Sequence, residues 1–247
     1  MLTTHRRAAA VAGIGVTLLL AACGGSSSSG AGGGSASAAP KAESQLKGLS
    51  AEQVLAKAKE ATASAKSLHY HADGTSGAEK ILFDVRADKA RGAIATVEAS
   101  GQQVKLIQDT KDVYIGGKNT LITTLAGGKD VTGKWVKTSA SNPAATSVLE
   151  LADPAKFTAQ FFTLESGQKV ELGTPKTVDG KQTVALVISG GKGGGTMYVS
   201  AEGTPYPLLI ESAGGSTDKG TVTFSEFDQP VDVQVPAAAD VITAPGA

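Results

Sequence analysis

Residues 68–87 read LHYHADGTSGAEKILFDVRA, and their alternation sets a pattern that most of the chain repeats. Apolar and polar side chains alternate from Leu68 to Asp73, which is typical of a β-strand with one buried face. Ser76-Gly77 is a turn-forming pair, and apolar residues return after it. Because strands joined by a short turn pair antiparallel, the stretch predicts an antiparallel pair at Leu68–Thr75 and Lys80–Ala87.

The same period of two continues towards the C-terminus and predicts about eleven strands in two groups. Asp179-Gly180 lies between two such segments and is a strong hairpin signal. Residues 119–126 are ambiguous, because their apolar side chains fit one helical turn as well as a strand. The other predicted strands are Arg91–Ala99, Gln102–Asp109, Asp112–Ile115, Lys134–Thr138, Gln168–Thr177, Gln182–Ser189, Thr196–Ser200, Tyr206–Ser212, Gly220–Phe227 and Val231–Val235.

Two regions have helical patterns. Ser50 is followed three residues later by Gln53, which forms a capping-box signal, and apolar residues then recur at helical spacing. This predicts a helix over residues 51–67. Farther on, Asn142-Pro143 and Asp153-Pro154 each place a capping side chain before a proline suited to the first helical position. The apolar faces of this second region would come from Val148, Leu149, Leu151, Phe157, Phe161 and Phe162.

These patterns predict an α+β fold with a curled antiparallel sheet. A sheet of about eleven strands must curl, and its concave apolar face needs the cover that the two helical regions can supply. Aromatic residues make up only 4% of the chain, and many inward positions hold Val, Ala or Thr. Small linings leave space, which favours a cavity for a lipid or another hydrophobic ligand. The alternative is an ordinary filled core.

The N-terminal residues have the pattern of a bacterial lipoprotein signal. Arg6-Arg7 precedes an apolar segment, residues 8–20, that is too short for a transmembrane helix and suited to a signal-peptide core. Leu20-Ala21-Ala22-Cys23 then matches a lipobox, in which the cysteine becomes the first mature residue and its thiol carries acyl chains such as palmitate. We expect an exported protein, anchored by lipid to the outer face of the cell membrane. An ordinary secretory signal with an incidental cysteine is the alternative.

Composition divides the rest of the chain and restricts its chemistry. Residues 1–22 are the predicted signal peptide, 23–45 a lipid-anchored Gly/Ser/Ala tether, 46–243 one folded domain and 244–247 a tail. Removal of the signal leaves 21 basic and 23 acidic residues, which does not favour a nucleic-acid partner. Cys23 is the only cysteine, so its acylation leaves no thiol for a disulfide, a cysteine nucleophile or a thiolate metal site.

No catalytic motif emerges from the sequence. His69 and His71 face the same side of a predicted strand and could bind a metal with Asp73, but a polar solvent face is the interpretation that we favour. The glycine-rich stretch Gly190–Gly195 joins two predicted strands, whereas a phosphate loop joins a strand to a helix. No Gly-x-Ser-x-Gly elbow is present. We therefore predict no catalytic residue, no metal site and no cofactor; a hydrolase with an unrecognised site is the remaining enzyme alternative.

The order of these features resembles the actinobacterial lipoproteins of the LppX/LprG type, which share an architecture with the carriers LolA and LolB. The likeness is most particular near the C-terminus, at residues 197–200 (MYVS), 203–208 (GTPYPL), 224–227 (FSEF), 230–231 (PV) and 236–241 (PAAADV). The resemblance implies an unclosed β-barrel covered by helices, whose cavity in the best-known members holds acyl chains of lipids or lipidated proteins. The chain departs from it in its thin aromatic lining and its glycine-rich loop.

We therefore expect a membrane-anchored lipoprotein that binds or carries a lipid, or another acylated ligand, between sheet and helices. The alternative is a non-enzymatic accessory lipoprotein that binds a protein of the cell envelope and has no open cavity. Cys23 is the predicted lipidation site. The predicted cavity residues alternate along strands or lie on apolar helix faces: Val54, Leu55, Ile81, Phe83, Val85, Leu106, Ile115, Phe157, Phe161, Leu186, Leu208, Ile210 and Phe224.

Overall fold

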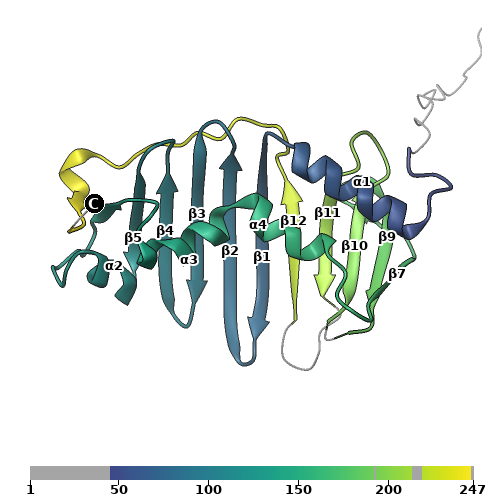
Figure 1. The fold of residues 1–247 in the computed structure, drawn as a ribbon, viewed down its shortest axis with the longest axis horizontal. Helices are drawn as coiled ribbons and strands as arrows, with labels where there is room; N and C mark the ends of the chain where they lie inside the picture. Colours follow the sequence, from purple (N-terminus) through teal and green to yellow (C-terminus); the bar gives the residue numbers. More distant parts are fainter. Residues whose placement is uncertain (1–44, 192, 213–218, 246–247) are drawn as a thin grey trace, which may run out of the picture. The chain divides into compact units, whose positions relative to one another are not determined.

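The computed structural model describes residues 45–191, 193–212 and 219–245, which belong to one compact unit, Ala42–Ala247. Cys23, the predicted signal peptide and nearly all of the predicted tether lie outside the described residues. Within them, one mostly antiparallel sheet of thirteen strands is curled and unclosed, and its main helices lie on one face (Figure 1). The predicted α+β class and architecture are confirmed. No helix among the described residues is both long enough and apolar enough to cross a membrane.

The sheet consists of two meanders that meet in its middle. Its order is β13-β6-β5-β4-β3-β2-β1-β12-β11-β10-β9-β7, with β8 paired to β9 beside this path. The seam between the meanders is the antiparallel pair β1–β12, in which Tyr70 lies opposite Phe224. The strands are β1 (Ser67–Ser76), β2 (Glu79–Asp88), β3 (Gly92–Ala99), β4 (Gln102–Gln108), β5 (Val113–Lys118), β6 (Trp135–Thr138), β7 (Lys169–Leu172), β8 (Thr177–Val178), β9 (Lys181–Ser189), β10 (Gly195–Ser200), β11 (Pro207–Ser212), β12 (Gly220–Ser225) and β13 (Val241–Thr243).

The first helix, α1 (Ala51–Ser64), begins as its sequence predicts. The Ser50 hydroxyl accepts a hydrogen bond from the backbone N–H of Gln53, and the Gln53 side chain accepts one from the backbone N–H of Ser50. This is the reciprocal capping box. The ambiguous residues 119–126 contain a short helix, α2 (Thr120–Leu125), capped by Asn119.

Helices α3 (Pro143–Ala152) and α4 (Pro154–Ala159) cross the sheet because the topology demands it. The first meander reaches β6 near one edge, and the second starts at β7 on the opposite edge. The chain between them must return across the face, and Figure 1 shows α3 and α4 along this path, in front of the strands. The carboxylate of Asp153 accepts hydrogen bonds from the first backbone N–H groups of α4, as the Asp-Pro signal predicts.

Two strand predictions are wrong in detail, and the sheet has thirteen strands rather than about eleven. Residues Val231–Val235 form no strand; they belong to an extended segment that runs along the ends of β1–β4 (Figure 1). Its anchors are side chains and strand-end carbonyls, since the backbone N–H of Val231 donates to Asp88 and that of Asp228 to the carbonyl of Ser67. The predicted strand Gln168–Thr177 is broken into β7 and β8. β13 was not predicted, and it pairs parallel to β6, unlike the other pairs.

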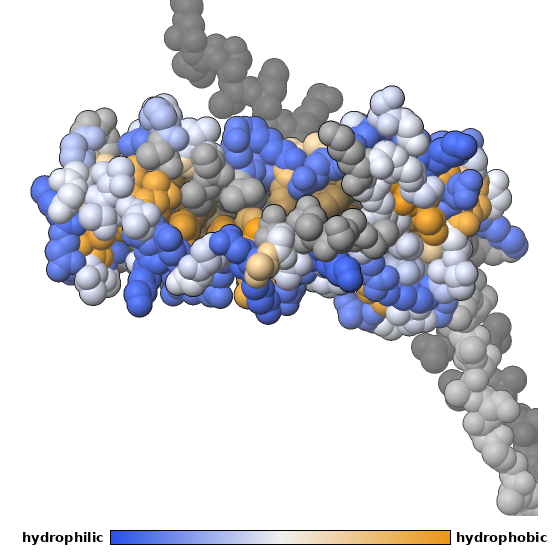
Figure 2. Space-filling model, turned by 90° about the horizontal axis from the view of Figure 1, so that it is seen from below, coloured by the Kyte–Doolittle hydropathy of each residue, from blue (hydrophilic) through white to orange (hydrophobic). Residues whose placement is uncertain are grey.

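Several of the chain's few aromatic residues gather at one place in the layer between sheet and helices. The rings of Tyr70 in β1 and Phe157 in α4 are stacked, with centroids 4.1 Å apart and planes 10° apart. Phe161 meets Phe157 edge to face at 5.3 Å and reaches Phe224 of β12 at 6.4 Å. This aromatic cluster fastens α4 to the β1–β12 seam. Seen along the strands, hydrophobic residues lie between polar outer surfaces (Figure 2).

We predict that Ser50→Ala lowers the free energy of unfolding by about 1 kcal/mol, because it removes one half of the capping box. Urea unfolding monitored by circular dichroism would measure the loss. Lys57→Ala, an exposed change within the same helix, is the control and should stay within about 0.5 kcal/mol. An equal loss in the two variants would contradict a specific role for the cap.

Candidate ligand pocket

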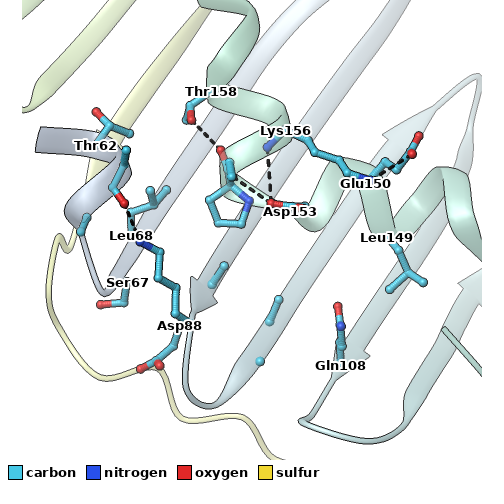
Figure 3. Close-up of a pocket in the computed structure, with 18 of the residues that line it drawn as sticks. Thr62, Ser67, Leu68, Asp88, Gln108, Leu149, Glu150, Asp153, Lys156 and Thr158 are labelled. Carbon is cyan, nitrogen blue, oxygen red and sulfur yellow. Dashed lines mark hydrogen bonds and ion pairs between the residues drawn. The ribbon is translucent and has the colours of Figure 1, made fainter. Parts of the chain in front are cut away.

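A pocket of about 710 Å³ lies between the helices and the ends of strands β1–β4. Figure 3 shows its lining residues converging from α1, from the α3–α4 region and from the sheet. Its apolar walls are Leu68 from β1, Ala87 from β2, Ala93 from β3, Leu149 from α3 and Phe162, which follows α4. The pocket therefore lies beside the aromatic cluster, at one end of the same layer.

Small side chains create this space. Leu68 lies opposite Ala87, and Ala87 lies opposite Ala93, so the three share the face beneath the helices. One step further along β2 and β4, that face carries Val85 and Leu106, which are buried and fill the layer. The two alanines lack the side-chain volume to do so at the strand ends, and a gap remains.

A glycine lets β3 start close to the end of β4 at the pocket. Gly92 has a φ of 114°, and a Cβ atom there would lie 1.9 Å from the carbonyl oxygen of Gln108. Only glycine fits this backbone conformation and this approach. Gln108 itself lines the pocket, so the close contact of the two strands sets part of its rim.

Acidic side chains of the lining are committed to local partners. Asp153 caps α4, and Asp109 accepts hydrogen bonds from the backbone N–H groups of Lys111 and Asp112 at 2.7 Å each. The N–H donors, first of all that of Asp112, and the charges of Lys111 and Lys137 outweigh the opposing effect of burial and hold the pKa of Asp109 below its usual value. Glu150 forms an ion pair with Lys156 at 3.1 Å. The lining also includes Lys59, Lys66 and Lys89.

None of the thirteen predicted cavity residues lines this pocket, and their contact with a ligand stays a prediction. Most belong to the two hydrophobic clusters of the layer between helices and sheet. The buried ones are Val54, Leu55, Val85, Leu106, Ile115, Phe157, Leu186, Leu208 and Phe224. The half-buried ones are Ile81, Phe83, Phe161 and Ile210.

Leu208 lies apart from the other predicted cavity residues. It packs with Val178, Ala185 and Tyr198 in a separate small cluster. The sequence places Leu208 and Ile210 on one face by simple alternation. However, the register between β10 and β11 shifts at Tyr198, and such an irregularity interrupts the alternation of faces.

Sequence reasoning missed the residues that form the pocket walls. Leu149 and Phe162 were expected only as parts of apolar helix faces, and Leu68, Ala87 and Ala93 only as strand positions. The available signal was the alanine at the inward positions of two neighbouring strand ends. It could be used only with the strand register, which puts Ala87 opposite Ala93.

His69 and His71 point away from the helices and take part in a polar network. His69 Nε2 and His71 Nδ1 lie 3.1 and 3.3 Å from the same carboxylate oxygen of Asp84, and Arg86 pairs with the other oxygen at 3.1 Å. Among the described residues, no group of three or more His, Cys, Asp or Glu side chains could hold a metal ion. The common carboxylate partner explains the pair of histidines structurally.

Ser225 completes a serine–histidine–aspartate chain on this face. Its hydroxyl lies 3.1 Å from His69 Nδ1, and His69 Nε2 lies 3.1 Å from Asp84. A hydrolase also needs a concave substrate site and donors for the oxyanion. Ser225, His69 and Asp84 do not line the 710 Å³ pocket, which is on the other face of the sheet. The chain of hydrogen bonds is accounted for as a surface network across the β1–β12 seam.

The network shifts the acid–base behaviour of Asp84. Partial burial alone would raise the pKa of its carboxyl group, but hydrogen bonds from His69 and His71 and the charge of Arg86 more than offset this, so the pKa lies below its ordinary value. A carboxylate with a depressed pKa stabilises the fold above its unfolded pKa, about 3.9, and this contribution disappears as the pH falls through the folded pKa.

We therefore predict that the stability difference between the parent and Asp84→Asn narrows as the pH falls from about 5 to 3. Urea midpoints at both pH values would measure it. In a His69→Gln background the narrowing should be smaller, since a hydrogen bond that lowers the pKa of Asp84 is gone. A pH-independent difference in the parent background would show that the network does not act on Asp84.

No protein-family model matches the chain, and no curated protein does. Solved structures do match. LprF from Mycobacterium bovis aligns with 15% identity over 80% of this chain and 100% of that chain, with a TM-score of 0.51. The lipoprotein LppX from Mycobacterium tuberculosis aligns with 15% identity over 74% of this chain and 97% of that chain, with a TM-score of 0.49.

A LolA superfamily protein from Nitrosomonas europaea also matches, with 12% identity over 76% of this chain and 96% of that chain and a TM-score of 0.24. At these identities the comparisons concern the fold alone, and the similarity to LprF carries the conclusion. The chain has the fold of LprF, in agreement with the curled, unclosed sheet that the sequence predicts.

Proposed function

We propose that this protein is an exported lipoprotein of the cell envelope that binds an acyl chain of a lipid, or of another acylated ligand, in the pocket beside α1 and α4. The observation that carries the proposal is the pocket itself. It has about 710 Å³, apolar walls and a position between the sheet and its helical cover. This volume lies within the range of about 300 to 1,000 Å³ that is usual for small-molecule sites.

The physical basis of binding would be the removal of apolar surface from water. Each methylene that leaves water contributes about 0.8 kcal/mol, so even part of an acyl chain on Leu68, Ala87, Ala93 and Phe162 supplies useful affinity. Contacts with apolar walls have no directional requirement, so they suit a flexible acyl chain. We infer a carrier or binding role without catalysis.

Two alanines of β3 offer a matched test. Ala93 and Ala95 lie on the same face of the strand, and each is 5% exposed, but only Ala93 lines the pocket. We predict that Ala93→Leu costs less than about 1 kcal/mol of stability, because the added atoms enter empty space, and that it weakens binding of a fluorescent fatty-acyl probe. Ala95→Leu should instead cost about 1 to 3 kcal/mol by overpacking, and its folded protein should bind the probe as the parent does.

Fluorescence titration and urea unfolding of the three proteins would measure both effects. Mass spectrometry of lipid extracted from the purified, unlipidated domain would give independent support if it found co-purified acyl ligands. If the two variants bind the probe saturably and with equal affinity, the ligand site lies elsewhere. No probe binding by the parent would remove the carrier function and favour an accessory lipoprotein that binds an envelope protein.

We further propose that Cys23 is acylated and anchors the mature chain to the outer face of the cell membrane through the Gly/Ser/Ala tether. Two or more acyl chains make such anchoring stable, whereas one chain alone is marginal. We predict that Cys23→Ala blocks acylation, so that the variant stays in the aqueous phase of a detergent partition while the parent enters the detergent phase. Identical partition of the two proteins would contradict the lipobox interpretation.

A further inference from the structure

We propose that the ligand of this pocket is an anionic amphiphile, with its carboxylate or phosphate group at Lys59, Lys66 and Lys89 and its chain against the apolar walls. The inference rests on the acyl-binding function proposed above and adds the chemistry of the head group. It starts from an imbalance at the rim of the pocket: the acidic side chains there have partners, whereas several lysine N–H donors do not.

The acidic side chains of the rim leave little capacity to hold a cation. Asp88 accepts hydrogen bonds from the backbone N–H groups of Ala90, Arg91 and Val231, and it forms an ion pair with Arg91 at 3.8 Å. Asp109 and Asp153 accept backbone N–H groups, and Glu150 is paired with Lys156, as described above. Each of these carboxylates is therefore already stabilised by groups of the protein.

The lysine ammonium groups, in contrast, have few partners. Within the part of the chain that the structure describes, the ammonium groups of Lys59 and Lys66 have no side-chain hydrogen bond and no ion pair. Lys89 Nζ donates one hydrogen bond, to the carbonyl oxygen of Ala63 at 2.6 Å. Because an ammonium group carries three donors, all three lysines keep donors for a ligand.

Asp228, which is outside the pocket lining, interacts electrostatically with Lys66 and Lys89, but its oxygens are occupied. The Tyr206 hydroxyl donates to Oδ2 at 2.6 Å, and the backbone N–H of Lys66 donates to Oδ1 at 2.7 Å. These two hydrogen bonds, together with the charges of Lys66 and Lys89, hold the pKa of Asp228 below its usual range. Asp228 thus positions Lys66 through its backbone and leaves the ammonium group to the rim.

Backbone contacts hold the lysines on one side of the pocket. The N–H of Lys89 donates to the carbonyl oxygen of Lys66 at 2.9 Å, which ties the end of β2 to the segment after α1. Lys59 lies in the last turns of that helix. A helix C-terminus normally disfavours an anion because of its exposed carbonyl groups. The bond from Lys89 to Ala63 covers one of these carbonyls with positive charge, so an anion can approach.

Amphiphiles with one dodecyl chain and different head groups would test the assignment: dodecanoate, dodecyl phosphate and dodecanol, each displacing a neutral fluorescent acyl probe. In the parent at low salt, we expect the two anions to bind at least about fivefold more tightly than the alcohol, since each exposed charge pair contributes a factor of about 1.5 to 5. The preference should shrink in high salt, because salt screens exposed charges.

Three variants of exposed lysines locate the effect. Lys59→Gln combined with Lys66→Gln should bring the anion preference close to one while leaving dodecanol affinity unchanged. The same pair replaced by arginine should restore the preference. Lys57 lies on the same helix as Lys59 but outside the pocket lining, so Lys57→Gln should keep the parent's preference for the anions. Thermal unfolding of each variant would confirm that the fold is intact.

The outcomes separate the head group from the proposed function. Equal binding of all three probes by the parent, or an anion preference that survives in the glutamine variant, would overturn the head-group assignment and leave acyl binding standing. Failure of every dodecyl probe to bind would remove the acyl-binding function as well. Inorganic phosphate alone is the control without an acyl chain. If it binds as tightly as dodecyl phosphate, the ligand is a free anion, and the proposal of an amphiphilic ligand is overturned.

Discussion

The antiparallel pairing of β1 with β12 is the constraint on which the rest of the structure depends. It brings together residues 156 apart in the chain, as in the contact between His69 and Ser225. Once this seam is formed, the first meander grows towards one edge and the second towards the other. The connection between them must then return across the sheet, and α3 and α4 provide the helical cover for the concave face as a consequence (Figure 1).

The same crossing explains why a filled core and an open pocket coexist in one layer. Phe157 and Phe161 of the crossing segment meet Tyr70 and Phe224 at the seam, so several of the chain's few aromatic rings fill the centre of the layer. Towards the strand ends the sheet offers Ala87 and Ala93, whose small side chains leave the space that Phe162 borders. A low aromatic content therefore leaves space at the end of the layer.

Local patterns predicted the elements well, and long-range geometry decided what they could not. The alternation after Leu68 and the Ser50–Gln53 capping box depend on neighbours in the chain, and both identify elements that the structure contains. The side of the sheet on which Leu208 lies depends on a register shift against β10. The path of Val231–Val235 along the strand ends, in place of the predicted strand, depends on a hydrogen bond to Asp88, which is distant in the chain. Alternation within a segment carries no information about such partners, so the pocket walls could not be found from it.

The segment after β12 links the seam to the pocket rim. Asp228 accepts a hydrogen bond from the backbone N–H of Lys66, and the N–H of Val231 donates to Asp88, so this one segment contacts two residues that line the pocket. It then continues to β13, which pairs with β6 at the far edge of the sheet. The first meander is thereby held at its outer edge as well as at the seam. These non-local contacts keep the backbone at Lys66 and Lys89 in place before any ligand arrives, and such preorganisation reduces the ordering cost of binding.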